Sequence, residues 1–455
     1  MTTVDSLQTQ IKSVITLYSN GQIQEALDSV ETLTKSYPNE PMLYNISGVC
    51  YKAIGQLDDA VKSFERALAI KPDYIEVNYN LGVTLKELGQ LDAAVKSYEK
   101  AITLKPDYAE AHNNLGVTLK KLNQLDNAVE CYEKALALKP DYAEAHNNLG
   151  NAFKELGQVE DAVMSYKKAL DIKPDYAEVH NNLGNAFQDL GQVEAAVECY
   201  EKALSLISDN ADTYNNLGIA YMQLDQPDAA IKCYKKALFL LPDYADAYAN
   251  LGNVMDHLDR LDEALASYER AIALNPDLDY VFNDYLKTKM YLCIWDDLAN
   301  HLDELTDKVN NGEKVLNPFV ALSLLDDPKL QRKATEIYAS DKYPKNYFLP
   351  KIERYPKHEK IRIGYFSADF GNHPVSYLTA ELYEMHDRER FEIHAFSFGS
   401  DKEDKMTLRI KAGVDHFHDV RRMSYADTAI LARSVEIDIA VDLGGYTANC
   451  RTEIF

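Results

Sequence analysis

A 34-residue period constrains the fold of this chain more than any other feature of its sequence. The segment PDYAEAHNNLG, which begins at Pro106, recurs with the same letters at Pro140. A proline marks the same place in almost every unit, and Ser208 replaces it once: Pro38, Pro72, Pro106, Pro140, Pro174, Pro242 and Pro276. A fixed period of this length is typical of chains in which one small structural unit stacks on the next.

Each unit has the residue spacing of two helices. The second predicted helix carries an alanine at two recurring places, as at Ala128 and Ala135, and an aromatic residue between them, as at Tyr132. Small residues let helices approach closely, and we expect the aromatic ring to fill the space between neighbouring units. Proline ends each unit because it cannot continue the second helix. This spacing resembles the tetratricopeptide repeat family, which implies an all-α superhelix with a long concave face.

The fading of the repeat pattern indicates where the domains begin and end. The predicted segments are a degenerate N-terminal repeat at 1–37, seven tetratricopeptide repeats at 38–275, a helical cap or adapter at 276–340, a connector at 341–360 and an α/β region at 361–455. Capping units of a repeat array are expected to be atypical. Trp295, the single tryptophan, is predicted to lie in the core of the cap.

Charge and cysteine content exclude several classes of function. The formal net charge is −24, which disfavours both nucleic acid and an anionic membrane surface as partners. No apolar run is long enough to span a bilayer, and the N-terminal residues do not resemble a secretory signal. Six cysteines in 455 residues do not form a disulfide framework, so we expect a cytoplasmic protein.

A column of asparagines recurs on the first helix of the units: Asn80, Asn114, Asn148, Asn182, Asn216 and Asn250. A carboxamide both donates and accepts hydrogen bonds, so a ladder of them can hold an extended peptide backbone. The alternative is that each asparagine braces one helix against the next. The sequence leaves both interpretations open.

Two other columns are predicted to be structural. Cys131, Cys199 and Cys233 are a repeat or more apart, whereas the ligands of a metal ion must converge on one point. His112, His146 and His180 also follow the repeat template. We therefore expect no metal site.

The pattern changes at residue 361, where strands begin to alternate with helices. Residues 361–367, 391–398, 416–420 and 437–443 read as strands, and 376–386, 403–412 and 424–434 as helices. This alternation predicts a parallel sheet with helices on its faces, and ligands then bind at the carboxyl ends of the strands. The loops at 368–377 and 444–447 stand at such ends.

The residues in these loops resemble the protein O-GlcNAc transferase family. The resemblance rests on Gly364-Tyr365-x-Ser367-x-Asp369-Phe370-Gly371-Asn372-His373-Pro374, on Arg388 and Arg390-Phe391-Glu392, and on Asp438-Ile439 and Asp442-Leu443-x-Gly445-Tyr446-Thr447. It implies that a tetratricopeptide superhelix is followed by a partial α/β, Rossmann-like domain, the first lobe of a two-lobed (GT-B) transferase. Tyr377 departs from the family, whose members often have a second histidine there.

What the resemblance implies about function is specific. The family transfers N-acetylglucosamine from UDP-GlcNAc to Ser or Thr of proteins, with inversion at the sugar and without a metal or cofactor. His373 falls on the active-site histidine and could accept a proton from the acceptor hydroxyl. Asn372, Pro374, Tyr446 and Thr447 line the same cleft by resemblance, and acceptor proteins bind in the repeat groove.

The sequence ends before the second lobe, which holds most of the UDP-binding groups in the family. We therefore expect a truncated chain that is inactive alone. The alternative function is a non-catalytic tetratricopeptide adapter. The donor sugar, which could be fucose instead, and the acceptor proteins stay open.

Overall fold

The computed structural model describes residues 3–344, 349, 358–400, 403–445 and 451–454. The chain forms two compact units, Met1–Val254 and Met255–Phe455. Each unit is described by itself.

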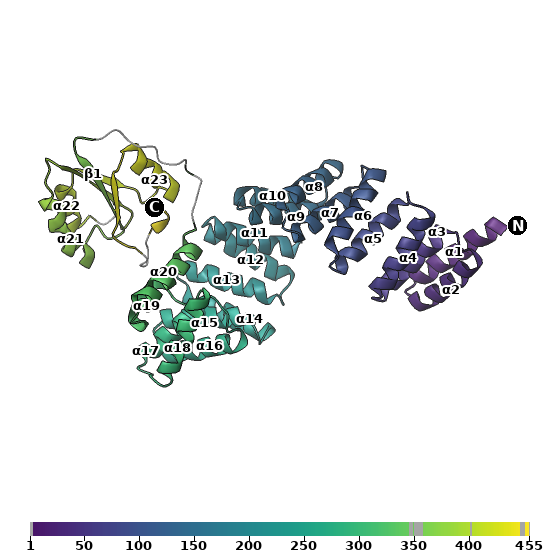
Figure 1. The fold of residues 1–455 in the computed structure, drawn as a ribbon, viewed down its shortest axis with the longest axis horizontal. Helices are drawn as coiled ribbons and strands as arrows, with labels where there is room; N and C mark the ends of the chain where they lie inside the picture. Colours follow the sequence, from purple (N-terminus) through teal and green to yellow (C-terminus); the bar gives the residue numbers. More distant parts are fainter. Residues whose placement is uncertain (1–2, 345–348, 350–357, 401–402, 446–450, 455) are drawn as a thin grey trace. The chain divides into compact units, whose positions relative to one another are not determined.

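The first unit consists of antiparallel helix pairs (Figure 1). Its helices are α1 (Thr3–Ser19), α2 (Ile23–Ser36), α3 (Pro41–Ala53), α4 (Leu57–Ile70), α5 (Ile75–Glu87), α6 (Leu91–Leu104), α7 (Ala109–Lys121), α8 (Leu125–Leu138), α9 (Ala143–Glu155), α10 (Val159–Ile172), α11 (Ala177–Asp189), α12 (Val193–Leu206), α13 (Ala211–Gln223), α14 (Pro227–Leu240) and α15 (Ala245–His257), of which the last continues into the second unit. The predicted tetratricopeptide architecture is confirmed.

The recurring aromatic residue packs inside its own unit. A Cβ atom added to Gly116 on α7 would lie 2.6 Å from Cε1 of Tyr132 on α8. The same contact recurs between Gly150 and Tyr166. We expected the ring to fill the space between neighbouring units. The structure shows that it also packs against the glycine in the first helix of its own pair, where a side chain would leave no room for the ring.

The turns between paired helices contain a residue in the left-handed backbone region. Gly89 has a φ of +73° in one such turn, and Asn123 takes the same place with a φ of +58°. Asparagine is among the few residues with a side chain that adopt this conformation readily. The repeat template thus tolerates the loss of glycine at this position.

The helical part of the second unit contains α16 (Leu261–Leu274), α17 (Val281–Tyr291), α18 (Leu298–Asn311), α19 (Pro318–Leu324) and α20 (Pro328–Lys342). Its core is built around Phe282, Leu286, Leu305 and Val309. Trp295 is 52% exposed and does not belong to this core. The prediction that Trp295 is buried is wrong, because the residue follows the end of α17 and the apolar stripe does not continue through that turn.

The α/β part of the second unit contains β1 (Ile361–Ser367), α21 (Pro374–Met385), β2 (Phe391–Ser397), α22 (Lys405–Gly413), β3 (His416–Asp419), α23 (Tyr425–Ser434), β4 (Ile439–Asp442) and the 3-10 turn η1 (Thr452–Ile454). The four strands form a sheet in the order β3-β2-β1-β4. All neighbouring strands are parallel, and Ile361 pairs with Phe391 at the start of β1. The predicted parallel sheet is confirmed.

Helices cover both faces of this sheet (Figure 1). On one face, Ile363, Tyr365 and Ile393 pack with residues of α21 and α22, including Tyr383 and Ile410. On the other face, Phe366 and Phe396 pack with residues of α23 such as Leu431. The alternation of side chains along each strand divides the apolar residues between the two layers.

Candidate functional site

The loop after β1 leads directly into α21 and carries the motif residues. Phe370 is 5% exposed and anchors the loop in the core against Tyr383 and Phe417. The hydroxyl of Ser376 donates a hydrogen bond to the carbonyl oxygen of Asp369. These contacts anchor both ends of the loop, and the polar residues between them are therefore held in place by the core.

His373 is the N-cap residue of α21. Its Nδ1 accepts a hydrogen bond from the backbone N–H of Val375 at 3.3 Å, and Oδ2 of Asp369 lies 3.5 Å from the same nitrogen. Pro374 follows as the first helical residue, where its missing N–H costs nothing. The imidazole is 46% exposed. Helix capping therefore explains the position of His373 and leaves Nε2 on the solvent side of these contacts.

Asp404 holds the loop from the side of α22. Its carboxylate caps α22 and also accepts the backbone N–H of Asn372 at 2.6 Å. Hydrogen bonds from the backbone of Thr407 first, and of Asn372, hold the pKa of Asp404 below its ordinary value. The Tyr377 hydroxyl donates to Oδ1 of Asn372 at 2.8 Å. The tyrosine that departs from the family pattern thus orients the side chain of Asn372.

The loop after β2 crosses this site at very short range. A Cβ atom on Gly399 would lie 1.6 Å from the carbonyl oxygen of Ala368. Only glycine fits, because backbone atoms cannot move aside as a flexible side chain can.

The turn after β4 lies beside the loop after β1, since the two strands pair and Phe366 is opposite Asp442. Oδ1 of Asp442 accepts the N–H groups of Gly444 and Gly445 at 2.9 and 3.0 Å. Tyr446 and Thr447, predicted to bind substrate, lie outside the described residues. In the order β3-β2-β1-β4, β2 and β3 lie on one side of β1 and β4 lies on the other side, so the order in which strands are added switches at β1. Open α/β sheets bind ligands at such a switch point. The loop after β1 and the turn at Gly444 and Gly445 lie at the ends of the two strands that flank it.

The asparagine column forms contacts between units. Nδ2 of Asn148 donates to Oδ1 of Asn113 at 3.0 Å, and Nδ2 of Asn182 donates to Oδ1 of Asn147 at 3.1 Å. The remaining ladder residues also donate to the preceding unit: Asn80 to Asn45, Asn114 to Tyr79, Asn216 to Asn185 and Asn250 to Asn215. One amide N–H of each ladder residue is therefore used as a brace. All six side chains are only partly buried.

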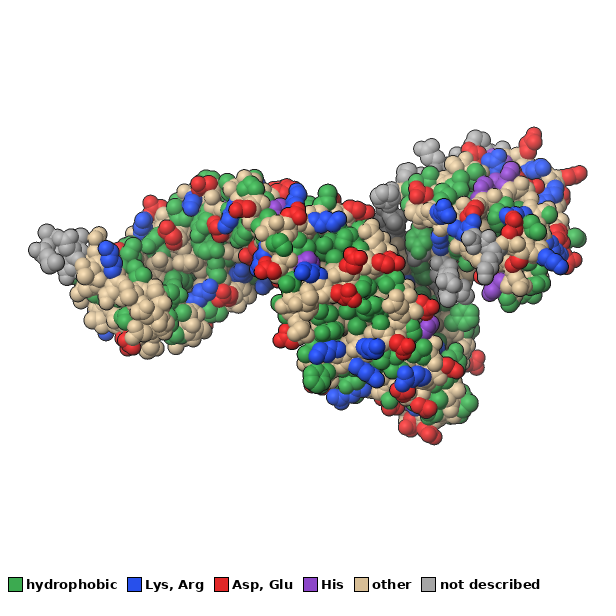
Figure 2. Space-filling model, turned by 180° about the vertical axis from the view of Figure 1, so that it is seen from behind, with side chains coloured by type: hydrophobic (Ala, Val, Ile, Leu, Met, Phe, Trp, Pro, Cys, Tyr) green, Lys and Arg blue, Asp and Glu red, His purple; other side chains and the backbone are tan. Residues whose placement is uncertain are grey.

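The ladder lies next to a groove on the first helices. A hollow of about 410 Å³ is lined by Lys120 of α7, Asn151 and Lys154 of α9, Tyr166 of α10 and Asn182 of α11. Lys120 pairs with Glu155, and Lys154 with Asp189 at 3.4 Å. Because both lysines of the hollow are paired with carboxylates, the groove suits a polar chain of mixed charge better than a polyanion. Acidic and basic side chains are also interspersed on the face of the protein shown in Figure 2.

The other two columns have local structural partners. Nε2 of His112 lies 3.1 Å from the carbonyl oxygen of Pro106, and His146 and His180 repeat this contact with their own prolines. Burial raises the pKa of the Cys131 thiol to about 11. These cysteines are therefore neutral packing residues.

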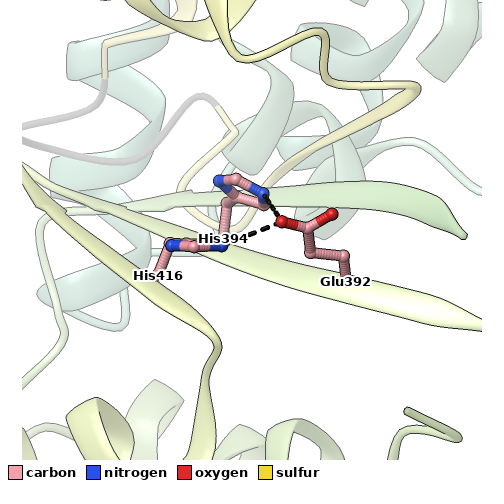
Figure 3. Close-up of side chains that lie close together, drawn as sticks. All are labelled: Glu392, His394 and His416. Atoms are coloured by element: carbon pink, nitrogen blue, oxygen red, sulfur yellow. Dashed lines mark hydrogen bonds and ion pairs between the residues drawn. The ribbon is translucent and has the colours of Figure 1, made fainter. Parts of the chain in front are cut away.

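A cluster that the sequence analysis did not identify lies on the sheet. Glu392 and His394 of β2 and His416 of β3 place their side chains together (Figure 3). Burial, followed by the neighbouring His416 and His418, lowers the pKa of His394 to about 4. Burial opposes ionisation of Glu392, but hydrogen bonds from His416 and Arg362 outweigh it and lower the pKa of that carboxyl. The Glu-x-His and His-x-His spacing in adjacent strands was the available signal.

The fold and the two loops define a tetratricopeptide repeat protein that continues into a glycosyltransferase-like α/β region. Residues 338–455 match the model of glycosyl transferase family 41. Residues 48–191 match a TPR repeat model in four overlapping segments, and 175–277 match a second tetratricopeptide repeat model. Together these matches join tetratricopeptide repeats to part of a glycosyl transferase family 41 region, which is the combination that the resemblance to O-GlcNAc transferases predicts.

The chain is similar to curated proteins over part of its length. The chain is 30% identical over 185 residues to a probable UDP-N-acetylglucosamine--peptide N-acetylglucosaminyltransferase, SEC, of Arabidopsis thaliana, over 37% of this chain and 19% of that one. It is 33% identical over 98 residues to the Caenorhabditis elegans UDP-N-acetylglucosamine--peptide N-acetylglucosaminyltransferase, over 21% of this chain and 8% of the other. The chain thus spans a fifth or less of either relative.

Among solved structures, the crystal structure of MamA matches this chain at 28% identity and a TM-score of 0.34, over 36% of this chain and 97% of the other. In the part of the chain that the structure describes, no helix combines the length and apolar character needed to cross a bilayer.

Proposed function

We propose that this chain supplies the acceptor-binding repeats and the first-lobe wall of the active site in a protein O-glycosyltransferase. The reaction would move N-acetylglucosamine from UDP-GlcNAc to a Ser or Thr hydroxyl of an acceptor protein, with inversion and without a metal or other cofactor. The observation that carries this proposal is the position of the His373 loop beside the β4 turn, at the switch point of a sheet that matches glycosyl transferase family 41.

In this proposal His373 acts as the general base. In the described structure Nδ1 accepts the N–H of Val375, so the neutral imidazole carries its proton on Nε2. The proposed role as a base requires the other tautomer, in which a proton on Nδ1 faces Oδ2 of Asp369 at 3.5 Å and the lone pair of Nε2 accepts the proton of the acceptor hydroxyl. The hydroxyl oxygen then bonds to the anomeric carbon while the bond to UDP breaks. Asn372 and Pro374 fix the loop, and Tyr446 and Thr447 follow the neighbouring turn in the sequence.

The asparagine ladder supports the part of the proposal that concerns acceptor binding. Each ladder asparagine uses an N–H group as a brace, and Asn182 donates to both Asn147 and Asn151. The carboxamide oxygen still has two lone pairs, and an asparagine with a single brace keeps a second N–H. These groups could bind the backbone of an extended acceptor peptide along the groove. The interspersed charges of the repeats leave this recognition broad.

The test is a transfer assay on the native protein, in which an antibody against the repeats first establishes the length of the native polypeptide. That protein is assayed with UDP-GlcNAc and an array of Ser- and Thr-containing peptides. We expect His373→Ala to abolish transfer while peptide binding persists, and His180→Ala, a repeat histidine outside the loop, to retain transfer. Unchanged transfer in His373→Ala would remove the histidine from the mechanism.

The same assay distinguishes the alternative function, a non-catalytic adapter, from a transferase. Peptide binding without transfer by the native protein would favour a scaffold, and loss of that binding in Asn148→Ala and Asn182→Ala would assign it to the ladder. We expect the 455-residue polypeptide alone to bind peptide and not to transfer sugar, because the family resemblance places most UDP-binding groups in a second lobe.

A further inference from the structure

We propose that Glu392, His394 and His416 form a binding site for a first-row divalent metal ion, of which zinc is the best candidate. The three residues lie within one register of two paired strands. Glu392 and His394 are two positions apart on β2 and so point to the same face, and His416 of β3 is the direct pairing partner of His394. Directly paired residues in neighbouring strands bring their side chains within contact distance.

The ligand atoms already converge. Oε1 of Glu392 lies 2.8 Å from Nε2 of His416 and 3.5 Å from Nε2 of His394, and one ligand atom from each residue falls within 4.8 Å of the others. Figure 3 shows both imidazoles directed at the same carboxylate oxygen. Zinc bonds of about 2.0–2.2 Å in a tetrahedral site hold ligand atoms roughly 3.3 Å apart. Small side-chain rotations therefore suffice to admit an ion.

His394 provides an independent indication of a missing ligand. The residue is 4% exposed, yet among the described residues its Nε2 has only the contact with Oε1 of Glu392 at 3.5 Å, which is too long for a good hydrogen bond. A buried polar atom normally has a partner, and its absence requires an explanation. The lone pair of a neutral imidazole directed at a metal ion would supply one.

The surrounding residues orient the ligands as a metal site requires. Nδ1 of His394 lies 3.0 Å from Nε2 of His418, so a proton on Nδ1 leaves Nε2 free to bind an ion. Nε of Arg362 donates to Oε2 of Glu392 at 3.1 Å, which leaves Oε1 directed at the histidines. Metal ligands are commonly held by such outer hydrogen bonds.

The chemistry of the donor set and the access to it narrow the choice of ion. Two imidazoles and one carboxylate suit zinc and similar divalent ions, whereas calcium and magnesium prefer oxygen ligands alone. The side chain of His416 is 49% exposed and offers a route for entry. The cluster lies toward the amino ends of β2 and β3, at the opposite end of the strands from the His373 loop. The ion would thus fasten the edge strand β3 to β2 rather than take part in transfer.

The test is zinc titration of the full chain, followed by calorimetry and by thermal unfolding. We expect one zinc ion per chain at this site and a melting temperature that rises with zinc. Glu392→Gln, His394→Phe and His416→Gln should each weaken binding by at least about 10- to 100-fold. The matched control is His358→Gln, which alters a histidine between Glu436 and Asp438 in the same region and should leave the affinity unchanged.

A cobalt-substituted sample identifies the ligands directly. A spectrum with nitrogen and oxygen ligands that is lost in His394→Phe would support the site. Thiolate charge-transfer bands would assign the ion to a cysteine and overturn the proposal. Absence of zinc binding at millimolar metal, or equal affinity in wild type and all three ligand variants, would also overturn it. Circular dichroism of each variant separates lost ligands from lost folding.

Discussion

The change Asn182→Ala tests whether the asparagine ladder holds the repeats together. Nδ2 of Asn182 donates to Oδ1 of Asn147 at 3.1 Å and to Oδ1 of Asn151 at 3.3 Å. Asn147 is 2% exposed, so its oxygen has no access to water when that donor is removed. An unsatisfied buried acceptor costs about 1–3 kcal/mol. We expect the free energy of unfolding to fall by about that amount.

A double-mutant cycle with Asn147→Ala isolates the contact. Removing both partners leaves no buried acceptor unsatisfied, so the loss in the double variant should be smaller than the sum of the single losses. Contacting polar residues show coupling energies of about 0.5–3 kcal/mol. Because the two residues lie on α9 and α11 in adjacent units, the coupling reports on stacking between units.

The assay is urea unfolding followed by far-UV circular dichroism, with hydrogen exchange to locate the loss in α9 and α11. Repeat arrays can unfold in parts, so the local measurement is needed beside the global one. The control is Asn127→Ala, an exposed residue whose side chain donates to nearby Gln124, where we expect a change within about 0.5 kcal/mol. Equal effects of Asn182→Ala and Asn127→Ala, or strict additivity in the cycle, would refute the brace.

Two further predictions concern the second unit. Gly399→Ala should prevent the loops after β1 and β2 from packing, because the new Cβ would lie 1.6 Å from the Ala368 carbonyl oxygen. Limited proteolysis should then cleave the α/β region of the variant, and resistance to the protease equal to that of wild type would contradict this prediction. Hydrogen bonding, to Lys314 first, lowers the pKa of Asp341 to about 2, so the stability that the ionised carboxylate contributes is complete above the ordinary pKa near 3.8 and is lost as the pH falls through about 2. Because Lys314 is 42% exposed, we expect the free energy of unfolding to fall by less than about 1 kcal/mol over this range, and by less still in Lys314→Gln. If the stability of wild type and of Lys314→Gln depends on pH in the same way, this ion pair is not the source of the loss.

Local patterns made much of the fold predictable. The 34-residue period predicts the helix pairs because each pair depends on residues close in sequence, and β1 was predicted from Ile361 to Ser367 as observed. The position of the His373 loop also followed, because ligand loops stand at the carboxyl ends of parallel strands. Trp295 was assigned wrongly because a helical stripe in the sequence does not reveal where the helix ends.

The contacts of the ladder could not be read from the sequence. Asn182 and Asn147 are 35 positions apart, and their hydrogen bond depends on how far one unit rotates against the next. The same carboxamide is compatible with a brace and with a peptide-binding group, and only the packed repeats show that the brace is formed.

By itself, the sequence determined the repeat array, the change to an α/β region and the family motif, because periodicity and local propensity carry that information. Tertiary structure decided which distant side chains meet. His394 and His416 are opposite one another only because β2 and β3 pair in one register, and a shift by one residue would direct them to opposite faces of the sheet. Register follows from the packing of the whole region, which is why the cluster of Glu392 with the two histidines became visible only in the folded chain.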